Sequence, residues 1–81
     1  MTPLQTAMLG KIAAEELNGG NGRPEKAQET ETYADMIIET AQDKGVFTSL
    51  QNAGLVWHDG QKGREAGVGM TAEGFAAWVN R

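Results

Sequence analysis

Residues 46–74 read VFTSLQNAGLVWHDGQKGREAGVGMTAEG, and they predict most of the architecture of the chain. Its first apolar residues recur at helical spacing, and Gly54 ends this short helix because glycine adopts the left-handed conformation of a helix C-terminus without a clash. The β-branched and aromatic residues 55–58 then predict a strand. Turn-forming dipeptides between residues 59 and 63 indicate that residues 67–70 return as a second strand, so the two strands form a β-hairpin.

Helices are predicted at both ends of the chain. Thr71 can cap a last helix over residues 71–80, whose core-facing side chains are Phe75, Ala76 or Ala77, Trp78 and Val79. At the other end, Thr2 before Pro3 is typical of a helix start, and apolar residues at helical spacing extend this first helix over residues 1–17.

Two further helices are expected between residues 32 and 54. The second helix starts at Thr32 and ends near Gly45, and the third runs from Val46 to Gly54. The inward face of the second helix is formed by Tyr33, Met36, Ile37 and Ala41. Before it, residues 18–30 (NGGNGRPEKAQET) have no large apolar side chain, which predicts a flexible loop within one domain of residues 1–81.

Two segments of this pattern resemble the winged helix-turn-helix superfamily of bacterial and phage regulators. They are SLQNAGLV at residues 49–56 and VGMTAEG at residues 68–74, the second with Met70 where the family pattern has leucine. The resemblance covers roughly residues 32–80. It implies an α+β, mainly α fold with three helices, a two-stranded β-hairpin wing and a C-terminal helix. In that fold the helix-turn-helix spans residues 32–54 and the wing spans residues 55–70.

The resemblance also implies a DNA-binding surface. In DNA-binding members the third helix lies in the major groove and the wing reaches a neighbouring groove or the backbone. The residues that would approach base edges and phosphates are Thr48, Ser49, Gln51 and Asn52, and those that would contact phosphates are Lys44, Lys62 and Arg64. Gln and Asn side chains match the paired donor and acceptor of adenine. We therefore expect a small DNA-binding or transcription-regulating protein.

The charge distribution leaves a second function open. Residues 1–43 carry three basic and eight acidic side chains, a net charge of −5, whereas residues 44–81 carry four basic and three acidic ones, a net charge of +1. With few cations per copy, useful DNA binding requires a homodimer or a larger complex. The alternative is an acidic protein-interaction or inhibitor module, whose negative surface over residues 15–43 imitates a phosphate backbone.

Several other classes of function are not expected. The chain has no cysteine, which excludes disulfides and thiolate metal sites, and it has neither a membrane-length apolar run nor a signal-peptide pattern. His58 has no ligand at suitable spacing and is expected at the surface, while Trp57 and Trp78 are expected in the core rather than stacked on bases. We therefore expect a cytoplasmic, non-enzymatic protein that binds DNA or a protein partner, with no membrane contact, metal or cofactor.

Overall fold

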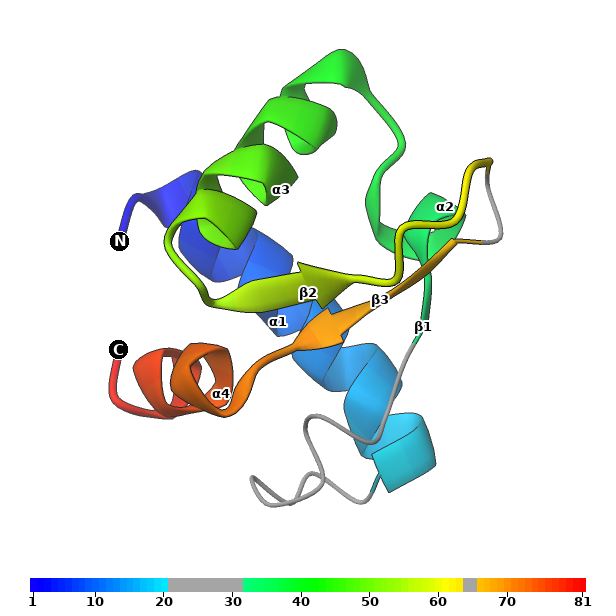
Figure 1. The fold of residues 1–81 in the computed structure, drawn as a ribbon. Coiled ribbons are helices and arrows are strands. Elements are labelled where there is room, and N and C mark those ends of the chain that lie inside the picture. The colour runs from blue at the N-terminus through cyan, green and yellow to red at the C-terminus, as the bar shows by residue number, and fades with distance from the viewer. Residues whose placement is uncertain (21–31, 64–65) are drawn as a thin grey trace.

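The computed structural model describes residues 1–20, 32–63 and 66–81, with the backbone alone for residues 15–20. Its elements in chain order are α1 (Pro3–Gly20), β1 (Thr32–Tyr33), α2 (Ala34–Ile37), α3 (Ala41–Asn52), β2 (Val56–His58), β3 (Gly67–Met70) and α4 (Ala72–Val79). Within the described residues there are thus four helices and one small sheet, which confirms the predicted α+β, mainly α class. In the view of Figure 1, helix α1 crosses behind the sheet, α3 lies above the sheet and α4 lies below the sheet.

The sheet has three antiparallel strands in the order β1-β3-β2. The β2–β3 hairpin pairs Val56 with Met70 and His58 with Val68, as the sequence predicted for residues 55–70. The prediction of a two-stranded sheet is wrong, because β1 adds a third strand that pairs Thr32 with Val68 and Tyr33 with Gly67. This pairing gives hydrogen-bond partners to backbone groups of β3 that a two-stranded hairpin would leave open.

The region from residue 32 to residue 52 differs most from the prediction. A continuous second helix from Thr32 to Gly45 is wrong, since α2 ends at Ile37 and α3 starts after Thr40. The cause is a capping box in which Thr40 Oγ1 accepts a hydrogen bond from the Asp43 amide, while Asp43 Oδ2 accepts one from the Thr40 amide. With the helix starting there, Gly45 lies inside α3 rather than at a helix end.

The predicted inward face of the second helix changes with these boundaries. Ile37 is fully buried, as expected, but Tyr33 and Met36 are 59% and 51% exposed, and Ala41 is also exposed. Tyr33 belongs to a strand, so its side chain points to the face of the sheet opposite to that of Thr32.

Helix α1 starts as predicted and continues further than predicted. Thr2 Oγ1 accepts a hydrogen bond from the Gln5 amide, and Gln5 Oε1 accepts one from the Thr2 amide, so a capping box begins the helix. The helix reaches Gly20 instead of ending at residue 17. Of the predicted loop at residues 18–30, the part from residue 21 onward lies outside the described residues.

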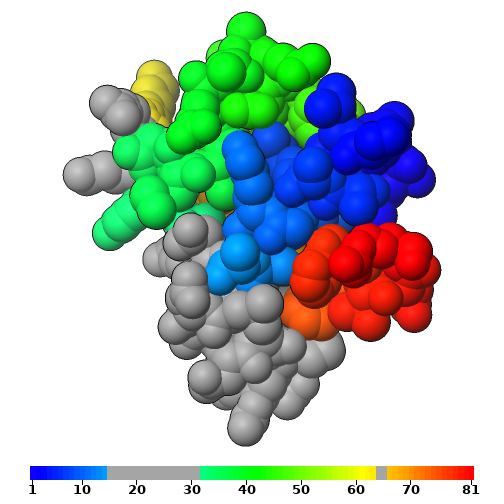
Figure 2. Space-filling view, turned by 180° about the vertical axis from the view of Figure 1, so that it is seen from behind, coloured from blue at the N-terminus to red at the C-terminus, as the bar shows by residue number. Residues whose placement is uncertain are grey.

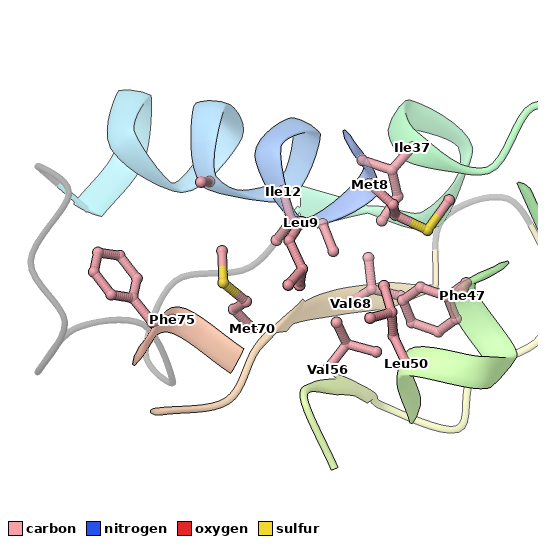
Figure 3. Packing of buried hydrophobic residues seen from close by; sticks show 11 residues of the cluster. Met8, Leu9, Ile12, Ile37, Phe47, Leu50, Val56, Val68, Met70 and Phe75 are labelled. Atoms are coloured by element: carbon pink, nitrogen blue, oxygen red, sulfur yellow. The ribbon is translucent and has the colours of Figure 1, made fainter. Parts of the chain in front are cut away.

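The core lies between α1 and the inward face of the sheet, closed by α3 on one side and α4 on the other (Figure 3). Its buried members are Met8, Leu9, Ile12 and Ala13 of α1, Ile37 of α2, Phe47 and Leu50 of α3, Val56, Val68 and Met70 of the sheet, and Phe75 of α4. These contacts remove the apolar faces of α1 and α3 from water and so fix the orientation of α3 against the hairpin.

The junction between α3, the hairpin and α4 is held by backbone hydrogen bonds. Gly54 has a φ of 77°, which allows the Leu55 amide to bond to the Leu50 carbonyl. Thr71 follows the second strand of the hairpin and bonds to the turn between α3 and β2. Its hydroxyl donates to the Gly54 carbonyl and its amide donates to the Leu55 carbonyl. The end of α3 and the start of α4 are therefore fixed to one another.

Candidate nucleic-acid interface

The outward face of α3 carries three of the four side chains predicted to contact DNA from this helix. Phe47 and Leu50 are buried, whereas Thr48, Ser49, Gln51 and Asn52 are all exposed, and Thr48, Gln51 and Asn52 lie on the side away from α1. The Thr48 hydroxyl donates to the Lys44 carbonyl at 2.9 Å, while the exposed amides of Gln51 and Asn52 each offer a donor and an acceptor. This face is polar and, apart from Lys44, uncharged.

Ser49, the fourth predicted contact, lies toward α1. Its hydroxyl donates to the Val46 carbonyl at 2.7 Å and accepts a hydrogen bond from Gln5 Nε2 at 3.0 Å. Ser49 is exposed, but its single hydroxyl proton and one of its two acceptor positions are already used in hydrogen bonds within the protein. The prediction missed Gln5 as the partner of Ser49, because no local pattern links two residues that lie 44 positions apart.

The hairpin turn is ordered by Asp59 and His58. Asp59 Oδ1 accepts from the Gln61 amide at 2.8 Å and Oδ2 from the Gly67 amide at 2.9 Å, so the carboxylate holds both sides of the turn together. These two hydrogen bonds lower the pKa of Asp59 below its ordinary value of 3.8. The Gly60 amide donates to His58 Nδ1 at 2.9 Å. Asp59 is thus a structural carboxylate of the turn.

Lys62 is exposed in this turn, and Arg64 lies outside the described residues. A hollow of about 450 Å³ separates the turn from α2 and the start of α3. It is lined by Ala34, Asp35, Ile38, Glu39, Lys44 and Gly63. Lys44 of α3 and Gly63 of the turn thus line the same hollow. The charged side chains that line it are the carboxylates of Asp35 and Glu39 and the ammonium group of Lys44.

The remaining candidates occupy structural positions. His58 is half-buried rather than fully at the surface, with its ring edge-on to Phe47 at a centroid distance of 6.3 Å. Trp78 is half-buried against the core, and the Arg81 guanidinium lies 4.5 Å from its ring centroid. Trp57 is half-buried on the outer face of the sheet beside Gly69, its partner on β3, so its expected place in the core is wrong. Among residues 1–14, 32–63 and 66–81, whose side chains are described, no group of three or more potential metal ligands comes together.

Helices α1 and α4, near the two ends of the chain, pack against each other. Figure 2 shows the surface of α1 between the green segment that contains α3 and the red segment that contains α4. On α1, Lys11 lines a small hollow with Leu4, Asp43 and Val46, and it does not line the hollow at the hairpin turn. Lys11 is therefore an exposed cation outside the candidate interface.

Comparison of the chain with protein-family models, curated proteins and solved structures finds no match. In the part of the chain that is described, none of the helices has both the length and the apolar character needed to cross a lipid bilayer.

Proposed function

We propose that the chain is a small winged-helix protein that binds duplex DNA through the outward face of α3 and the hairpin turn. The observation that carries this proposal is the shared hollow, because Lys44 of α3 and Gly63 of the turn both line it. The order of helices and hairpin from residue 32 onward also follows the pattern of the winged helix resemblance, with β1 added.

The side chains at this surface suit two different tasks. Thr48, Gln51 and Asn52 suit base edges, since an exposed helix fits the major groove and carboxamides match adenine. Lys44 and Lys62 suit phosphate oxygens. In the described part of this surface, Lys44 and Lys62 are two cations per copy and give a weak electrostatic contribution, so we propose that two copies act together on DNA.

Fluorescence anisotropy with a labelled duplex tests the proposal. With mixed-sequence DNA at about 50 mM salt, the combined change Lys44→Ala and Lys62→Ala weakens binding by about tenfold and lowers the salt dependence of log K by about 2 per copy. Lys11→Ala removes one exposed cation of α1, which lines the small hollow with Asp43 and not the hollow at the hairpin turn, and it is the single-charge control for Lys44→Ala alone. The proposal is wrong if the wild-type protein does not bind at micromolar concentration, or if Lys11→Ala weakens binding as much as Lys44→Ala alone.

The carboxylates in the hollow favour a second candidate, an acidic module that binds a basic protein segment. Asp35 and Glu39 line the hollow together with Lys44, so its charge is negative rather than positive. A labelled lysine-rich peptide then binds the wild-type protein, and Glu39→Gln weakens this binding. For the DNA-binding candidate the same variant strengthens duplex binding, because it removes a charge that repels phosphate. The direction of the Glu39→Gln effect thus separates the two functions.

A further inference from the structure

The contact between Gln5 and Ser49 joins the first turn of α1 to the middle of α3. Gln5 Oε1 completes the capping box of α1 by accepting from the Thr2 amide, and Gln5 Nε2 donates to Ser49 Oγ at 3.0 Å. One side chain therefore links the start of α1 to the helix that carries the proposed DNA-binding face.

This contact joins α3 to α1 outside the buried core that orients the helix. On one flank of α3, Phe47 packs edge-on against His58 of the hairpin. Ser49 lies two positions further along the helix, about 200° around it, and is held by α1 on the other flank. Thr48 and Asn52 project between these two flanks, so the pair of contacts sets the direction in which they point.

We propose that Gln5 and Ser49 are positioning residues that fix the rotation of α3, and that Ser49 does not itself contact DNA. The inference rests on the proposed function for its binding test. It differs from the role that the family resemblance implied for Ser49, because Ser49 Oγ, unlike Thr48 Oγ1, also accepts a hydrogen bond from another helix, from Gln5 Nε2 of α1.

A double-mutant cycle on duplex affinity tests the inference. Ser49→Ala weakens binding about threefold in the wild-type background, the scale of one hydrogen bond, and has no further effect once Gln5→Ala is present. Thr2→Ala is the control, since it removes the hydroxyl of the α1 capping box and leaves the Gln5–Ser49 bond in place. If Ser49→Ala weakens binding equally in both backgrounds, Ser49 touches DNA directly and the inference is overturned.

Amide NMR spectra of the protein without DNA provide a test that does not need the proposed function. Gln5→Ala and Ser49→Ala shift the same resonances of Thr48, Gln51 and Asn52, and the double variant shifts them no further. Independent, additive changes in these resonances overturn the inference. If the wild-type protein fails to bind the duplex while the resonances show this coupling, the proposed function falls and the positioning role stands.

Discussion

Two glycines in helices show how differently packing acts on the start of α4 and on the outward face of α3. At Gly74 of α4, an added Cβ would lie 1.8 Å from the Leu55 carbonyl oxygen and 2.8 Å from its carbon. At Gly45 of α3, an added Cβ would meet nothing within 4 Å. The start of α4 is thus determined by the contacts of the fold, whereas the outward face of α3 has no packing role at this position. Side chains on the outward face of α3 can therefore change at this position without disturbing the packing of the fold.

The largest expected effect comes from Gly74→Ala. The methyl group would overlap the Leu55 carbonyl, which is backbone and is already bonded to the Thr71 amide, so α4 must move. We expect a loss of about 3 kcal/mol in the free energy of unfolding, the upper part of the range for overpacking. Urea unfolding measures it, and a loss below about 1 kcal/mol would show that the junction is looser than the structure indicates.

The next effect is expected on the outer face of the sheet. Gly69 lies beneath Trp57, and an added Cβ would be 2.6 Å from the indole ring. Because the obstacle is a side chain that can turn away, Gly69→Ala should cost less than Gly74→Ala, about 2 kcal/mol. Urea unfolding gives the cost, and a shift of tryptophan emission to longer wavelength reports the displaced ring. Unchanged emission together with full stability would contradict this packing.

Gly45→Ala should have the opposite sign. Alanine in an unobstructed helix position stabilises the protein by about 0.5–1 kcal/mol, because it restricts the unfolded chain and favours the helix. Thermal unfolding of Gly45→Ala and of Gly74→Ala measures the two changes in stability, which should have opposite signs. A destabilised Gly45→Ala protein would mean that this face of α3 packs against another part of the chain or a second copy.

The smallest effect is a pH dependence at the hairpin turn. The pKa of Asp59 is lowered by hydrogen bonds from the Gln61 and Gly67 amides, so its carboxylate stabilises the fold above the ordinary value of 3.8. This stabilisation is lost as the pH falls through the lower pKa of the folded state. The difference in unfolding free energy between the wild-type protein and Asp59→Ala should therefore shrink as the pH falls below 3.8. A difference that stays constant would contradict the role of the carboxylate.

Local chemistry made the C-terminal half predictable. Gly54 ends α3 in a left-handed conformation, the hairpin turns between residues 59 and 63, and Thr71 caps α4 by accepting from the Gly74 amide. Each of these features depends on residues a few positions apart, which a sequence pattern records. The contact of Gly74 with Leu55 also gives a physical reason for glycine in the segment at residues 68–74.

The region from Thr32 to Thr40 could not be predicted in the same way. Its apolar spacing fits a helix, but Thr32 and Tyr33 pair with β3, more than 30 positions away, and a propensity pattern does not contain that pairing. The capping box at Thr40 and Asp43 is a local signal for the true start of α3, whereas the prediction places a helix start at Thr32.

For the candidate site, the sequence indicated the exposed positions Thr48, Gln51 and Asn52 but gave no sign that Ser49 is bound to Gln5. The hollow at the hairpin turn was not predicted either, because residues from three separate elements form it. Neither the Gln5–Ser49 bond nor the hollow could be found before the elements were placed in space.

An amide NMR titration with duplex DNA tests whether α3 and the hairpin turn bind DNA, because it locates the surface that DNA touches. The proposed function predicts salt-dependent shifts on the outward face of α3, at Thr48, Gln51 and Asn52, and in the turn around Lys62, with little change at Ala7 or Val79. Shifts confined to α1 and α4, or the absence of any shift at low salt, would contradict it.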